Sequence, residues 1–63
     1  MKITLRCAKN GKTYILTYDE ENILDTVECD GEFMVSTHHI VKRIVTNSEK
    51  IRVGVIPSGF SKV

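Results

Sequence analysis

Hydrophobic and polar residues alternate over residues 2–18, on both sides of the dipeptide Asn10-Gly11. This dipeptide is typical of a two-residue β-hairpin turn, because a type I′ turn needs positive φ at both central positions. The expected cross-strand pairs are Cys7 with Tyr14, Leu5 with Leu16, and Ile3 with Tyr18. All of these residues fall on one face, so the pattern predicts a hairpin that buries this face in a core.

A second hairpin is predicted after a polar connection over residues 19–22, which we expect to be a loop. Two further extended segments, 23–29 and 32–36, flank the dipeptide Asp30-Gly31, which again indicates a type I′ turn. The expected pairs are Val27 with Met34 and Thr26 with Val35. Hydrophobic and polar residues alternate less regularly here than in the first hairpin, so this prediction depends mainly on the turn.

Residues 37–45 fit two structures. A helix would gather four apolar side chains within roughly 140° of arc: Ile40, Val41, Ile44 and Val45. The same four side chains are β-branched, which lowers helix propensity and favours a strand. We prefer a tight turn over 37–39 followed by a strand over 40–46, and keep the helix as the alternative.

The segment 50–57 is the most continuous apolar alternation in the chain and predicts the last strand. Gly54 in its middle indicates a bulge or bend, and Pro57 would end it. Residues 58–63 are expected to be a flexible tail. The expected fold is therefore all-β over residues 1–57, a small antiparallel β-barrel or curled sheet of about five to six short strands.

The length of 63 residues implies one domain with a small core. A chain this short buries only roughly 60% of its unfolded surface, so we expect stability to come partly from a partner or a homodimer. Cys7 and Cys29 lack the spacing of a zinc site and are expected to be reduced, packed thiols in a cytoplasmic protein. Adjacent His38 and His39 would point to opposite faces of a strand, so no metal or cofactor is expected.

Charge is unevenly distributed along the chain, although the net charge is only +1. All nine Lys and Arg residues lie in 1–12 or 42–63. On the two last strands they would form a basic strip that could neutralise phosphates: Lys42, Arg43, Lys50 and Arg52. The first functional hypothesis is therefore a small regulatory module that contacts nucleic acid through this strip, although no aromatic residues are interleaved with it.

The acidic middle of the chain supplies the alternative. Seven of the eight Asp and Glu residues lie in 19–32, where they could present a negative surface to a basic protein. The residues expected to carry such a protein-interaction or inhibitor function are Glu20, Glu21, Glu28 and Glu32. Catalysis is not expected, because carboxylates at turns stay solvated and lack the raised pKa of a general acid.

Overall fold

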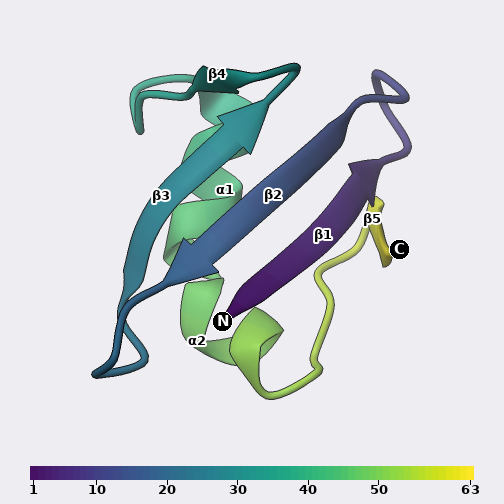
Figure 1. Cartoon of the computed structure of the whole chain (residues 1–63). Helices are drawn as coiled ribbons and strands as arrows, with labels where there is room; N and C mark the ends of the chain where they lie inside the picture. The colour runs from purple at the N-terminus through teal and green to yellow at the C-terminus, as the bar shows by residue number, and fades with distance from the viewer.

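One antiparallel sheet of five strands, covered on one face by two short helices, makes up the fold (Figure 1). The computed structural model describes residues 1–63. In chain order the elements are β1 (Lys2–Cys7), β2 (Thr13–Tyr18), β3 (Leu24–Cys29), β4 (Glu32–Phe33), α1 (His39–Thr46), α2 (Ser48–Arg52) and β5 (Phe60–Lys62). The sheet order is β4-β3-β2-β1-β5, so the sheet has two edges and does not close into a barrel. The mostly β prediction is confirmed in its curled-sheet form.

The first hairpin buries the predicted face, but its register is shifted by two residues. Ile3 pairs with Leu16 and Leu5 with Tyr14, because the strands are joined by a four-residue loop over 8–11. Only Gly11 takes a positive φ, of 69°, so the type I′ turn predicted at Asn10-Gly11 does not form. The Asn10 side chain instead accepts a hydrogen bond from Lys12 N–H at 2.9 Å. A shift of two residues preserves the buried face, because side chains alternate with a period of two.

The second hairpin has the predicted turn and register. Asp30 and Gly31 have φ values of 53° and 80°, as a type I′ turn requires. Glu28 pairs with Phe33, and Met34 N–H donates to Val27 C=O at 2.8 Å. The strand that follows the turn is much shorter than predicted, since β4 contains only Glu32 and Phe33.

The preferred strand over 40–46 is wrong, and the helix alternative is correct. In α1 the side chains of Ile40, Val41 and Ile44 are buried against the sheet, while Val45 is 39% exposed. Burial of this apolar stripe outweighs the modest helix propensity of β-branched residues. At this segment the spacing of apolar residues therefore determined the secondary structure, against the strand propensity of the individual residues.

The predicted last strand is also wrong, because residues 48–52 form α2 and Gly54 ends that helix. Gly54 has a φ of 98°. Its N–H donates to Ile51 C=O at 3.1 Å, and Val55 N–H donates to Lys50 C=O at 2.8 Å. These two bonds are the Schellman arrangement that commonly ends a helix at a glycine. The segment around Gly54, whose alternating pattern predicted a bent strand, is therefore the C-terminal end of a helix.

The C-terminal segment 58–63, expected to be a flexible tail, includes β5. This strand pairs antiparallel with β1, and Phe60 lies opposite Cys7. The fold has one core of buried apolar side chains with no buried polar residue. Its members are Ile3, Leu5, Cys7, Tyr14, Leu16, Tyr18, Val27, Cys29, Ile40, Val41, Ile44 and Ile51. Neither helix is long and apolar enough to cross a membrane.

Candidate functional site

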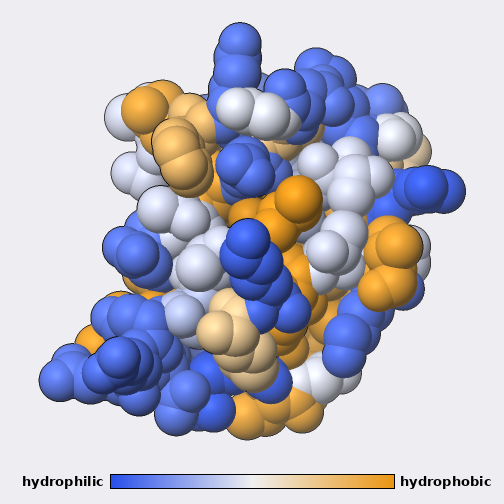
Figure 2. All heavy atoms as spheres, viewed as in Figure 1, coloured by the Kyte–Doolittle hydropathy of each residue, from blue (hydrophilic) through white to orange (hydrophobic).

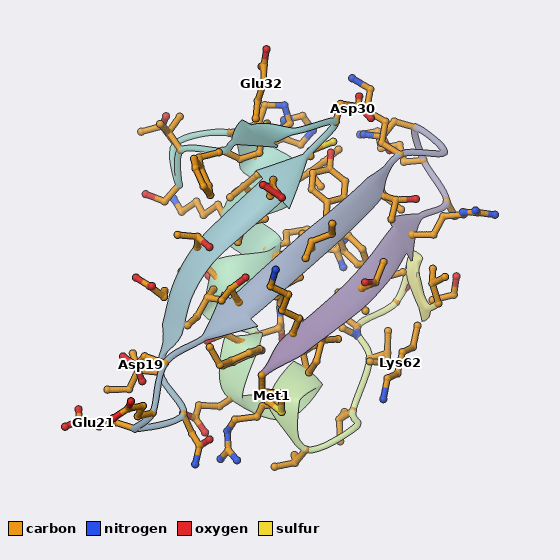
Figure 3. The ribbon with its side chains drawn as sticks, in the orientation of Figure 1. Met1, Asp19, Glu21, Asp30, Glu32 and Lys62 are labelled. Carbon is orange, nitrogen blue, oxygen red and sulfur yellow. The ribbon has the colours of Figure 1, made fainter.

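The acidic segment follows one edge of the sheet. The loop between β2 and β3 is fixed by Asp19, whose Oδ1 accepts from Glu21 N–H at 2.8 Å and from Ile23 N–H at 3.0 Å. Figure 3 shows Asp19 and Glu21 at one end of β3, and Asp30 and Glu32 at its other end. Lys62 lies at the opposite edge of the sheet (Figure 3). The fold therefore separates a negative edge at β3 and β4 from an edge at β5 that carries a lysine.

The four glutamates proposed from the sequence share this edge but not one face. Glu20 and Glu21 are exposed in the loop before β3. Glu28 is half-buried on the sheet face that the helices leave open, since its neighbours Val27 and Cys29 point into the core. Glu32 pairs with Cys29 and is exposed on the turn. A partner that meets all four glutamates must therefore lie along the edge.

An apolar groove lies beside this edge, between β3, the β4 segment and α1. It has a volume of about 380 Å³. Partly or fully buried side chains at its base are Leu24, Met34 and Val41. Exposed apolar side chains at its rim are Ile23, Phe33 and Val45, with exposed fractions of 55%, 72% and 39%. Figure 2 shows apolar atoms at the corner of the molecule over β4 and the loop after it (upper left).

The edge of β3 is only partly covered by β4. Pairing between the two strands is limited to Glu28 with Phe33 and Cys29 with Glu32, and the Met34–Val27 bond is the last contact of this ladder. Residues 24–26 have no strand on the side away from β2 (Figure 1). Asp25 lies in a bulge, because Thr17 pairs with Thr26 and Tyr18 with Leu24. An uncovered length of strand edge and apolar side chains thus occur together along the groove.

The basic residues proposed for nucleic acid lie on the helices rather than on paired strands. Lys42 and Arg43 are on α1, and Lys50 and Arg52 are on α2. The guanidinium of Arg43 donates to Ser58 C=O at 2.8 Å and lies 5.2 Å from the centre of the Phe60 ring. Arg52 pairs with Glu49 at 3.1 Å. Both arginines therefore have structural partners, whereas Lys42 and Lys50 are exposed.

The two histidines and the two cysteines are the remaining side chains that could supply a metal ligand or a nucleophile. The rings of His38 and His39 stack at 5.1 Å before and at the start of α1. No group of His, Cys, Asp and Glu side chains has the arrangement of a metal site. Cys7 and Cys29 are free and buried. Burial raises the pKa of the Cys29 thiol, and the negative charge of Asp30 raises this pKa further. A buried thiol with a raised pKa is a poor nucleophile.

Comparison of the chain with protein-family models, with curated proteins and with solved structures found no match.

Sequence reasoning found the acidic segment but missed the groove beside it. The groove depends on where β4 stops and on how α1 packs, and neither was predicted. One signal was present: Ile23, Phe33 and Val35 are large apolar residues within or next to an acidic hairpin, and all three are more than half exposed. Such residues clustered at one place often mark an interaction site.

Proposed function

We propose that this protein is a non-catalytic interaction module that binds a basic protein through its acidic β3–β4 edge. The observation that carries the proposal is the position of acidic residues at both ends of β3, beside an apolar groove that no other part of the chain fills. Complementary charge steers association and selects partners, while buried apolar area supplies affinity. The same argument applies to an inhibitor that occupies a basic site on its target.

An affinity experiment tests this proposal. Columns carry the wild-type protein, the variant E20Q/E21Q/E28Q/E32Q, or the control variant K42Q/K50Q, and a cell lysate is applied at low salt. We expect basic proteins to be retained by the wild type and by the control, and to be lost from the glutamine variant. Equal retention by the glutamine variant, or no retention by the wild type, would contradict the proposal.

Nucleic-acid binding is the second candidate, and one observation favours it. The two helices carry four basic residues and only one acidic residue, so the helical layer is positively charged. The residues concerned are Lys42, Arg43, Lys50 and Arg52. Binding through them would weaken steeply with salt. Fluorescence anisotropy with single- and double-stranded RNA and DNA pools at low salt tests this candidate, and no binding to any pool would exclude it.

Self-association and a cytoplasmic location are further proposals. The accessible surface of 4243 Å² is close to the ~4,100 Å² expected of a compact monomer of this mass, so a dimer would join two chains that are each already compact. A dimer mass in sedimentation equilibrium is the expected result, and a monomer mass at all concentrations would refute it. The two free, buried thiols support a reducing compartment.

A further inference from the structure

We propose that the β3–α1 groove binds an extended peptide segment that joins the sheet as a strand beside residues 24–27. This inference rests on the proposed interaction function and specifies how the partner binds. Its chemistry follows from the site: apolar side chains at alternate positions, basic side chains between them, and a main chain free to form hydrogen bonds.

The backbone of β3 supports strand addition. Val27 C=O accepts a hydrogen bond from Met34, but Val27 N–H donates no bond back to Met34 C=O. In an antiparallel strand the N–H and C=O of one residue point to the same side, so the Val27 N–H lies on the open side of the strand. Added strands gain affinity from main-chain hydrogen bonds of this kind. The open edge begins where the chain's own β4 pairing stops.

The groove supplies the second half of the recognition. Successive side chains of an added strand would point alternately toward the helices and toward the sheet face that the helices do not cover. Those on the helix side would meet the apolar base and the rim residue Val45 on α1. A volume of about 380 Å³ is at the small end of the range of ligand pockets, which suits a few aliphatic side chains.

Charge decides between a second copy of this chain and a different partner. Two copies joined through their β3 edges would bring Asp25 and the neighbouring acids of both chains together, which is unfavourable. The bulge at Asp25 further discourages edge-to-edge pairing of identical strands. A basic peptide strand would be attracted by the carboxylates at both ends of β3. These are Asp19 and Glu21 at one end, and Asp30 and Glu32 at the other (Figure 3).

The test uses the heptapeptide acetyl-Lys-Val-Lys-Val-Lys-Val-Lys-amide as probe, titrated against the full chain by isothermal calorimetry. Two isomers of this peptide are compared, one N-methylated on its three valines and one N-methylated on its first three lysines. Alternate N–H groups of a strand point to opposite sides, so only one isomer loses the donors that face β3. We expect one isomer to bind like the parent and the other to bind at least about tenfold more weakly.

Two protein variants complete the test. Val45→Lys places a positive charge at the groove rim and is expected to weaken binding at least about tenfold. Val55→Lys is the matched control, since Val55 is 56% exposed and lies outside the groove, and it should bind like the wild type. Circular dichroism spectra of both variants should match that of the wild type if they are folded.

The outcomes separate this inference from the proposed function. Equal binding of both N-methylated isomers, equal binding by Val45→Lys, or no binding of the parent peptide up to about 1 mM would overturn strand addition. If E20Q/E21Q/E28Q/E32Q loses the peptide while both isomers bind equally, the acidic edge is used without strand addition. If the same variant binds as the wild type while the isomers differ, the strand is added but the glutamates do not select it.

Discussion

Replacing Gly54 by alanine tests the local structure that the sequence pattern predicted least well. Gly54 has a φ of 98° at the end of α2. The left-handed region is about 1–2 kcal/mol less favourable for an L-residue. Alanine also restricts the unfolded chain, which stabilises the folded state by about 0.4–1 kcal/mol. A Cβ at this position would meet no atom within 4 Å, so no packing term is added. The expected net destabilisation is about 1 kcal/mol.

Thermal unfolding followed by circular dichroism measures this effect. For 63 residues the unfolding entropy is about 130 cal/mol/K, so Gly54→Ala should lower Tm by about 8 °C. Two matched variants isolate the cause. Gly54→Asn should lose less, because asparagine tolerates positive φ. Alanine of the D configuration, introduced by chemical synthesis, should match or exceed the wild type.

If Gly54 lay in a strand, Gly54→Ala would raise the stability instead of lowering it. Glycine inside a strand is destabilising by roughly 0.5–1 kcal/mol relative to alanine. Gly54→Ala would then raise Tm by several degrees, and the D-alanine variant would be the less stable one. A Tm for Gly54→Ala equal to or above that of the wild type would refute the assignment of Gly54 as the end of α2.

Three further predictions concern the core. Tyr18→Phe removes the hydrogen bond from the Tyr18 hydroxyl to Ser48 C=O, 2.7 Å long, and should cost about 1 kcal/mol in urea unfolding; an unchanged midpoint would mean that this bond does not hold α2 to the sheet. Ile44→Ala should cost about 2–5 kcal/mol because Ile44 is fully buried, whereas Val45→Ala should change stability by less than about 0.5 kcal/mol; the reverse order would show that α1 presents its other side to the sheet. The pKa of the Cys29 thiol is raised in the folded state, mainly by burial. The folded state therefore keeps this proton to a higher pH than the unfolded chain, so the contribution of Cys29 to stability is constant below about pH 8.5 and falls above it. Thermal unfolding between about pH 7 and pH 9.5 should show this fall, and the fall should be smaller in Cys29→Ala; the same slope in both proteins would exclude Cys29 as its source.

Local patterns predicted the parts of the fold that local chemistry determines. The buried face of the first hairpin follows from strict alternation, and the turn at Asp30-Gly31 follows from the need for positive φ at both residues. The register of the first hairpin could not be read from Asn10-Gly11, because side-chain bonds of Asn10 to Lys12 N–H and to the Tyr14 hydroxyl favour a longer loop. Two-residue shifts leave the hydrophobic pattern unchanged, so the pattern cannot detect them.

The second half of the chain was predicted poorly because its structure depends on tertiary contacts. β-branched residues in 40–46 favour a strand by propensity, but in the structure this segment covers the apolar face of the sheet as an amphipathic helix. The acidic residues were found as a group from the sequence alone. Their relation to a groove and to an open strand edge depends on β4 ending at Phe33, which no turn signal or periodicity marks.

Amide hydrogen exchange, resolved by residue with NMR, tests the binding edge most directly. The wild-type chain is measured with and without a saturating amount of the lysine–valine heptapeptide. Strand addition predicts that exchange of the Val27 amide slows by about tenfold or more, while the amides of β5 at the opposite edge are unchanged. Slowing confined to the helices or to β5, or an unchanged rate at Val27, would contradict binding at the open edge of β3.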